Sequence, residues 1–163
     1  MKNDTNWFSL LACIIGVELV GIISSLFTVS SVSGWYQTLV KPVFNPPSSV
    51  FGPVWTILYA MIGISLYLVI SNKVIKKKSD SLKEKAYWAF GIQLALNFLW
   101  SILFFGVHNI GLAFIEIIVL WLAILFNLII VYKISKASFW LLVPYFIWVS
   151  FASLLNYSLL ILN

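Results

Sequence analysis

The sequence predicts an all-α integral membrane protein, a five-transmembrane-helix bundle that forms a single domain over residues 1–163. The composition indicates this first, because hydrophobic residues make up 62% of the chain and charged residues only 9%, whereas a soluble domain is about 25% charged. A hydrocarbon core about 30 Å thick takes roughly 20 residues as a helix, so this length supplies about five spans. The apolar runs also lack the alternation of β-barrel strands.

The apolar runs that predict the spans cover residues 7–27, 50–72, 85–107, 110–132 and 138–161. Each run is long enough to cross a bilayer with some tilt. Irregular backbone cannot face lipid, so each is expected to be helical. The first run is too long for the apolar core of a signal peptide, and no small-residue cleavage site follows a short core, so we interpret it as a span.

The longest loop is predicted between the first two spans, from Ser30 to Ser49. It contains one glycine and three prolines, and these residues interrupt helices. Its aromatic side chains, Trp35, Tyr36 and Phe44, are costly to leave in water. The loop is therefore expected to fold back over the mouth of the bundle.

The lysines predict the orientation of the chain, because all ten basic residues are lysine. With five spans, one side of the membrane holds only Lys41. The other side holds Lys2, Lys73, Lys76, Lys77, Lys78, Lys83, Lys85, Lys133 and Lys136. The positive-inside rule then predicts a multi-pass protein of the cell membrane, with a cytoplasmic N-terminus and the C-terminus outside. We interpret the short lysine run as a topology signal and expect membrane lipid, but no nucleic acid, as a partner.

Two carboxylates lie inside predicted spans, where a charge costs a few kcal/mol and normally faces the bundle interior. Glu18 and Glu116 are therefore candidate functional residues. The alternatives are that one is protonated or hydrogen-bonded in helix packing, or that Glu116, near the Asn109 turn, reaches the interface. The single His108 has no predicted partner, and no metal-ligand cluster or nucleophile motif is visible. No metal site is expected.

Polar and aromatic side chains recur at helical spacing on three of the spans. Residues four apart share a helix face. Such faces suit a pocket for a mostly apolar ligand, but buried amides also join membrane helices by hydrogen bonds. Both interpretations stay open for the three sets: Trp55 and Tyr59; Gln93, Asn97, Trp100 and Ser101; and Trp148, Ala152 and Asn156.

Other aromatic and small residues have simpler interpretations. The positions of Trp7, Trp88 and Trp140 near span ends are typical of interfacial anchors, and Trp121, in mid-span, is expected to face lipid. The small-residue pairs Gly91 with Ala95 and Gly21 with Ser25 indicate close helix contacts, either within the bundle or across a dimer.

Several distinctive motifs follow one another along the chain: WYQTLVKP at 35–42, NPP at 45–47, FGPVWTILY at 51–59, QLALN at 93–97 and PY at 144–145. In this order and spacing they resemble the TspO/MBR family of tryptophan-rich sensory and translocator proteins. The resemblance covers essentially the whole chain and implies a five-helix bundle, commonly a homodimer, with a cavity beneath the first loop. The implied ligand-binding residues are Tyr36, Trp55, Tyr59, Asn97, Trp100, Trp148, Ala152 and Asn156.

The resemblance also implies the ligands: porphyrins, notably protoporphyrin IX or a related tetrapyrrole, and isoquinoline or benzodiazepine-type drugs, with no obligatory cofactor. Three functions follow: a porphyrin-binding sensor or regulator of tetrapyrrole or stress metabolism, a porphyrin transporter, and a light-dependent porphyrin-degrading enzyme in which Trp55 and Trp148 act. The absence of an evident internal repeat argues mildly against transport. Leu128, Tyr132 and Lys136 match a sterol motif only loosely, so sterol binding is not implied.

Overall fold

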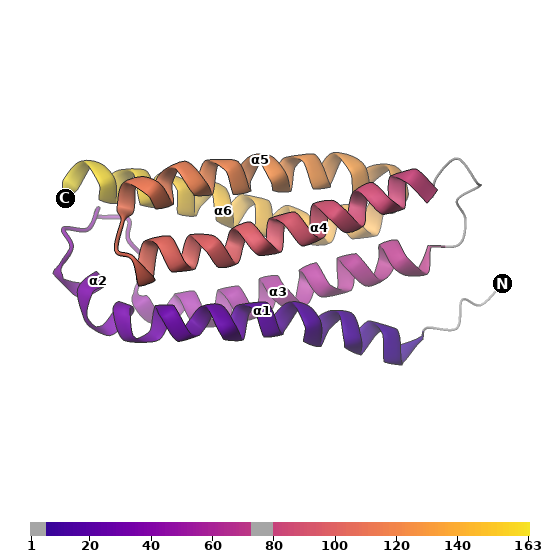
Figure 1. Cartoon of the computed structure of the whole chain (residues 1–163), viewed down its shortest axis with the longest axis horizontal. Helices are drawn as coiled ribbons and strands as arrows, with labels where there is room; N and C mark the ends of the chain where they lie inside the picture. Colours follow the sequence, from indigo (N-terminus) through magenta and orange to yellow (C-terminus); the bar gives the residue numbers. More distant parts are fainter. Residues whose placement is uncertain (1–5, 73–79) are drawn as a thin grey trace.

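The computed structural model describes residues 6–72 and 80–163, which form five long helices running side by side along one axis (Figure 1). They are α1 (Trp7–Ser33), α3 (Ser48–Ser71), α4 (Asp80–Ser101), α5 (Ile110–Ile134) and α6 (Lys136–Leu162). Five stretches, one in each helix, are long and apolar enough to cross a membrane. The described residues contain no strand. The predicted fold class is confirmed.

The first loop is shorter than the sequence predicted. The first span was expected to end at residue 27, but α1 continues to Ser33 because Gly34 is the first helix-breaking residue beyond it. A one-turn helix, α2 (Trp35–Thr38), follows directly. Helix α3 then begins at Ser48, just after the proline pair. Residues 30–49 are thus not one continuous helix, as expected, but the ends of the predicted loop overlap α1 and α3.

A π-helical segment, η2 (Ile102–Gly106), forms the end of the predicted third span. The Val107 N–H donates to the Ile102 carbonyl, five residues back, over 2.7 Å. Both Phe104 and Phe105 are buried in this wider turn. Single π turns of this kind are frequently found at functional sites.

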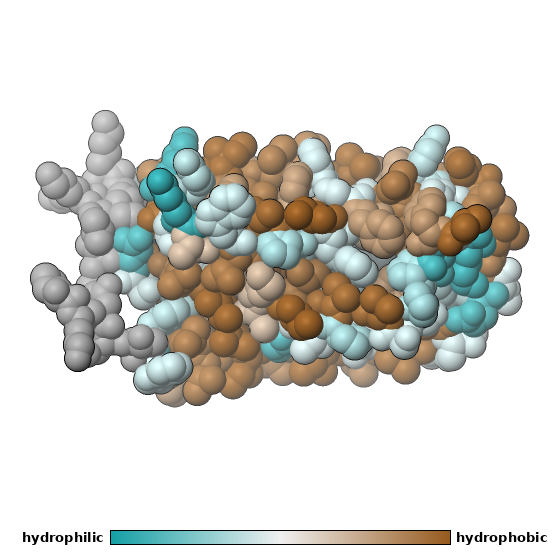
Figure 2. Space-filling view, turned by 180° about the vertical axis from the view of Figure 1, so that it is seen from behind, coloured by the Kyte–Doolittle hydropathy of each residue, from teal (hydrophilic) through white to brown (hydrophobic). Residues whose placement is uncertain are grey.

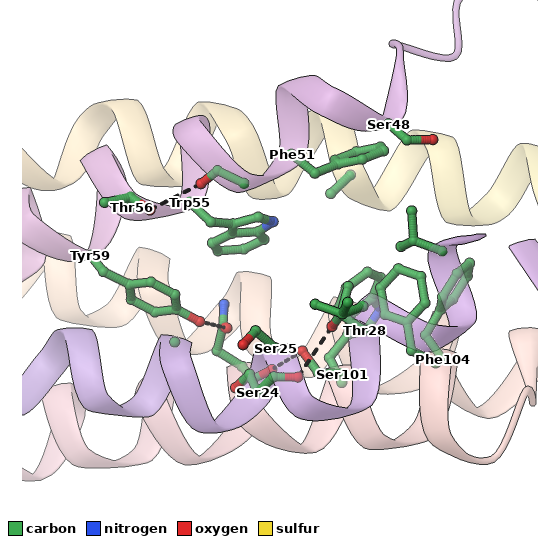
Figure 3. Close-up of a pocket in the computed structure, with 18 of the residues that line it drawn as sticks. Ser24, Ser25, Thr28, Ser48, Phe51, Trp55, Thr56, Tyr59, Ser101 and Phe104 are labelled. Atoms are coloured by element: carbon green, nitrogen blue, oxygen red, sulfur yellow. Dashed lines mark hydrogen bonds between the residues drawn. The ribbon is translucent and has the colours of Figure 1, made fainter. Parts of the chain in front are cut away.

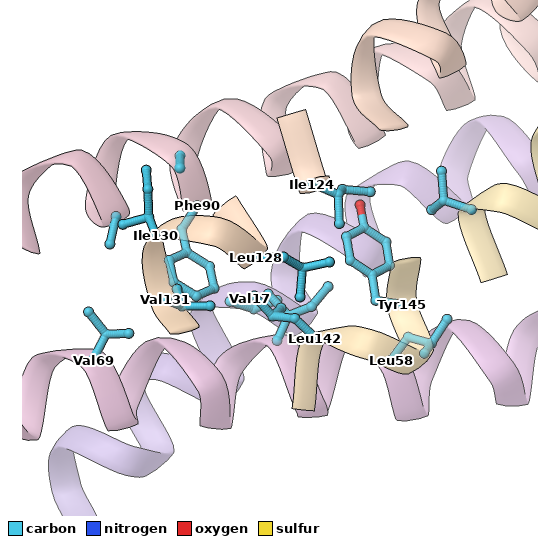
Figure 4. Packing of buried hydrophobic residues seen from close by; sticks show 14 of the residues in the cluster. Val17, Leu58, Val69, Phe90, Ile124, Leu128, Ile130, Val131, Leu142 and Tyr145 are labelled. Atoms are coloured by element: carbon cyan, nitrogen blue, oxygen red, sulfur yellow. The ribbon is translucent and has the colours of Figure 1, made fainter. Parts of the chain in front are cut away.

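The main apolar core fills the half of the bundle on the N-terminal side, and we call it the inner core. It is largely aliphatic, with Val17, Ile62, Ile124 and Leu142 among its fully buried members, and Figure 4 shows side chains from several helices meeting there. Gly63 lets α1 and α3 approach closely, because a Cβ at this position would lie 2.7 Å from the Ile14 Cα.

A second cluster lies beneath α2, and we call it the outer cluster. It consists of Tyr36, Phe104, Phe105, Ala113, Leu155 and Leu159. Half of these side chains carry aromatic rings, which meet edge to face or tilted, with centroids 4.8 to 6.2 Å apart. The buried members of the inner core are thus mostly aliphatic, whereas half of those in the outer cluster are aromatic.

The surface matches a membrane environment. Figure 2 shows apolar side chains over the middle of one face, with hydrophilic residues gathered toward the two ends. The described lysines Lys83, Lys85, Lys133 and Lys136 belong to the end where α4 and α6 begin, while Lys41 lies at the end with α2. The remaining lysines of the predicted topology signal lie outside the described residues. Trp7, Trp88 and Trp140 are about two-thirds exposed near helix ends, as expected of anchors.

Candidate functional site

A cavity of about 460 Å³ lies between α1, α3, α4 with η2, and α6, on the side of the bundle that α2 covers. Figure 3 shows Phe51 and Trp55 extending from α3 toward the opposite wall, where Ser24, Ser25 and Thr28 of α1 lie. The cavity lining includes all eight residues that the family resemblance implied as ligand-binding: Tyr36, Trp55, Tyr59, Asn97, Trp100, Trp148, Ala152 and Asn156. Helical spacing brings them together because each set faces the same interior space.

Trp100 is fixed in its orientation on the α4 wall of the cavity. Its indole N–H donates to the Asn156 Oδ1 over 3.1 Å. The ring stacks on Phe104 at 5.1 Å and meets Phe105 edge to face at 5.7 Å. The Asn156 amide in turn donates to the Ile110 carbonyl over 3.1 Å. This flat ring is therefore preorganised before any ligand enters.

The other two cavity tryptophans sit on facing helices and have free indole N–H groups. Trp55 on α3 tilts against Tyr59 at 5.5 Å, and Trp148 on α6 meets Phe51 edge to face at 6.4 Å. Neither indole N–H has a hydrogen-bond partner among the described residues. Among the described residues, apolar packing rather than hydrogen bonding holds these two indoles, through ring contacts and contact with the inner core.

A chain of hydrogen bonds closes the inner end of the cavity. The Tyr59 hydroxyl donates to the Asn97 Oδ1, and the Asn97 amide donates to the Tyr145 hydroxyl over 3.0 Å. All three side chains are buried. This network joins α3, α4 and α6 and satisfies polar groups that would otherwise be costly in the membrane interior.

The other end of the cavity is covered by Tyr36 on α2. The Tyr36 hydroxyl donates to the Asn45 Oδ1 over 2.6 Å, and the Lys41 ammonium lies 5.1 Å from the centre of the ring. Burial raises the pKa of the Tyr36 phenol, so it stays neutral. The Asn163 side chain holds the same segment through paired hydrogen bonds of 2.9 and 3.1 Å with the Val40 backbone. The predicted folding of the loop over the bundle mouth is confirmed.

Helix α1 supplies a polar wall that the sequence analysis did not assign to the cavity. We call its four polar residues, Glu18, Ser24, Ser25 and Thr28, the α1 wall; all four line the cavity. Gly21 lies on the same face, and its missing side chain leaves room for the Tyr59 ring, which a Cβ would meet at 2.5 Å. The sequence analysis noted Glu18 as a buried carboxylate and Gly21 with Ser25 as a small-residue pair, but nothing in the sequence linked them to the cavity.

Comparison with known proteins decides the family of this chain. The TspO/MBR family model matches residues 13–162. The chain is 43% identical to the tryptophan-rich protein TspO of Archaeoglobus fulgidus, over 97% of this chain and 99% of that protein. It is 42% identical to the protein of the same name from Chlorobaculum tepidum, over 94% and 95%. It is also 32% identical to the human translocator protein, over 93% and 88%. The chain belongs to the TspO/MBR family.

Not every candidate from the sequence lines the cavity of this TspO/MBR family member. Gln93 shares a helix face with Asn97, yet it turns toward α5 and accepts a hydrogen bond of 3.2 Å from the Asn127 amide. Glu116 is only 7% exposed, and neither of its oxygens has a hydrogen-bond partner among the described residues. The alternative that Glu116 reaches the interface was wrong. Sequence depth alone does not show toward which neighbour a side chain turns.

Two aromatic expectations also need correction. His108 was expected to lack a partner, but its Nε2 lies 2.9 Å from the Ser31 Oγ and its ring stacks on Trp35 at 4.3 Å. Trp121 was expected to face lipid, but its indole N–H donates to the Ser150 Oγ over 2.8 Å. Both contacts join segments far apart in the sequence, so spacing did not reveal them.

The two predicted small-residue pairs differ in their surroundings. Gly21 makes its close contact within the bundle, whereas Gly91 and Ala95 lie on an exposed face and a Cβ at Gly91 would meet nothing within 4 Å. Among the described residues, no cluster of three or more His, Cys, Asp or Glu side chains is placed to hold a metal ion.

Proposed function

We propose that this membrane protein binds porphyrins such as protoporphyrin IX, and similar flat apolar ligands, in the cavity beneath α2, with a sensory or regulatory role. The observation that carries the proposal is that three tryptophans from three different helices, Trp55, Trp100 and Trp148, line one cavity. Membership of the TspO/MBR family supports it.

The physical basis is a match between a flat π-surface and preorganised rings. A volume of about 460 Å³ falls in the range of small-molecule sites, about 300 to 1,000 Å³. Aromatic pairs add about 0.5 to 1.5 kcal/mol each beyond area burial. Because Trp100 is locked by Asn156 and Phe104, little side-chain entropy is lost on stacking.

The orientation of the chain bears on where a ligand meets the cavity. The described lysines are concentrated at the end opposite α2. By the positive-inside rule, that end is cytoplasmic, and the end covered by Tyr36 faces outward. The lysine bias therefore supports a cavity that lies in the outer half of the membrane.

A second function, light-dependent degradation of the bound porphyrin, is favoured by the position of Trp55 and Trp148 in the cavity and by their free indole N–H groups. Both indoles line the cavity, and their N–H groups are free of hydrogen bonds among the described residues. An indole beside a photoexcited porphyrin can pass one electron to it, leaving an indole radical cation and a porphyrin radical anion.

Titration of the purified protein with protoporphyrin IX tests both functions. In darkness, saturable quenching of tryptophan fluorescence is expected, and its absence would contradict porphyrin binding. Under illumination in air, the Trp55→Phe/Trp148→Phe double variant should bleach porphyrin at least tenfold more slowly than wild type. The matched control is Trp88→Phe/Trp140→Phe, which also removes two indoles, but from exposed sites. Equal bleaching by the two double variants would exclude the photochemical role.

A further inference from the structure

The hydroxyl groups of the α1 wall have their hydrogens committed to the helix itself. Ser24 donates to the Val20 carbonyl over 2.8 Å, Ser25 to Ile22 over 2.6 Å, and Thr28 to Ser24 over 3.2 Å. Each hydroxyl has one hydrogen and two acceptor lone pairs. The α1 wall therefore presents acceptors, rather than donors, to anything in the cavity.

Polar groups that line the cavity on the neighbouring helices also use most of their hydrogens in bonds within the protein. Thr56 donates to the Gly52 carbonyl over 3.1 Å and Ser101 to the Asn97 carbonyl over 3.5 Å. The Tyr59 hydroxyl and Trp100 indole hydrogens are also used, as described above. Among the described lining side chains, the donors left free are the indole N–H groups of Trp55 and Trp148, one amide hydrogen on each lining asparagine, and the Ser48 hydroxyl.

Glu18 strengthens this bias, since it is the only charged side chain among the described residues that line the cavity. It is half-buried, and no hydrogen bond or ion pair within the described chain engages its carboxyl group. A carboxyl group at this depth is costly unless it has a partner, and such groups mark ligand pathways.

We propose that the α1 wall is a hydrogen-bond acceptor surface that selects flat ligands carrying N–H donors or a protonated amine on one edge, with Glu18 as the group that receives them. This inference rests on the proposed function and specifies its ligand class. At the α1 wall, a ligand edge that bears carboxylates would meet the Glu18 carboxyl group and the lone pairs of the hydroxyl oxygens, which repel it. Such an edge turns instead toward the α2 end, where Lys41 lies over Tyr36.

Three forms of one macrocycle test the proposal: protoporphyrin IX, its dimethyl ester, and its bis(2-aminoethyl)amide. The ester has no charge and no added donor, whereas the amide carries two ammonium groups. In wild type, the amide should bind about tenfold more tightly than the ester. Glu18→Gln, which keeps the shape but removes the charge, should bring the two affinities within about threefold while the ester affinity stays within twofold. Ser25→Ala should reduce the ratio of amide affinity to ester affinity by less than Glu18→Gln does.

The control is Glu84→Gln, the same change at an exposed residue of α4 outside the cavity lining. It should leave the tenfold ratio intact. A wild-type ratio near one, or a ratio unchanged by Glu18→Gln, would overturn the acceptor-surface proposal while ester binding leaves the proposed function standing. No saturable binding of any of the three forms would overturn both.

Discussion

The inner core and the outer cluster solve the packing of the same five helices in opposite ways. In the inner core, aliphatic side chains interlock and Gly63 brings α1 against α3 at backbone distance. Around the outer cluster, aromatic rings meet one another and leave a cavity of about 460 Å³ beside them. If aliphatic side chains packed this part of the bundle at the density that is normal for protein interiors, they would fill the cavity.

The difference indicates how a small membrane bundle keeps a hollow without collapsing. Helices in lipid gain no hydrophobic energy from association, so close packing and hydrogen bonds hold them together. The inner core supplies the close packing. Rings fixed by partners, such as Trp100 on Asn156, keep the other half open. Stability and ligand binding are therefore expected to respond to different residues.

The largest effect is expected from filling the contact at Gly63. A Gly63→Val side chain would collide with α1 backbone, with the Ile14 Cα at 2.7 Å and the Cys13 carbonyl oxygen at 3.0 Å. Overpacking of this kind should lower the free energy of unfolding by about 3 kcal/mol, measured by thermal unfolding in detergent. The control Gly91→Val, where nothing lies within 4 Å, should change it by about 0.5 kcal/mol. Equal losses would refute the role of the α1–α3 contact.

A smaller effect on stability, but a clear one on binding, is expected from Ala152→Phe. Ala152 lines the cavity, so the new ring enters open space and the free energy of unfolding should change by less than about 1 kcal/mol. Porphyrin affinity should fall about tenfold, or about 1.4 kcal/mol, in a titration followed by porphyrin absorbance. Leu154→Phe places the same ring on an exposed position of α6 and should leave affinity unchanged. A variant that still binds normally would show that porphyrin does not use this cavity.

The smallest effect is expected at the covering residue Tyr36. Tyr36→Phe removes its hydrogen bond to Asn45 and should cost about 1 kcal/mol of stability, against little for Tyr157→Phe at an exposed site. Because burial raises the Tyr36 pKa, its contribution is complete below the ordinary tyrosine value of about 10 and is lost as pH rises through the raised pKa. The difference between wild type and Tyr36→Phe should therefore shrink in alkaline solution. A difference that grows there would contradict this account.

The sequence predicted most of the fold because a bilayer imposes a simple rule of length and polarity. Each of the five runs is long and apolar, and the helices were found where those runs lie. The eight lining residues were identified by helical spacing together with motif resemblance, which encode which side chains share a face.

The remainder depends on which neighbour each face meets, and spacing does not encode that. The hydroxyls of the α1 wall give no signal by themselves, because serine and threonine in a membrane helix satisfy their hydrogens locally. Gly63 acquires meaning only once Ile14 lies opposite it. The contacts of His108 and the inward orientation of Glu116 likewise depend on tertiary packing.

The π-helical segment η2 has a consequence for how this chain tolerates changes in length. A π turn is equivalent to one extra residue inserted in an α-helix. Deleting one residue between Ile102 and Gly106 should therefore restore a regular α-helix while the following turn keeps nearly the same orientation, because the wide turn already accommodates the extra residue. His108 would keep its contacts with Ser31 and Trp35. The same deletion in the middle of α4 would rotate everything beyond it by about 100°, so η2 is the place where this helix tolerates the loss of one residue.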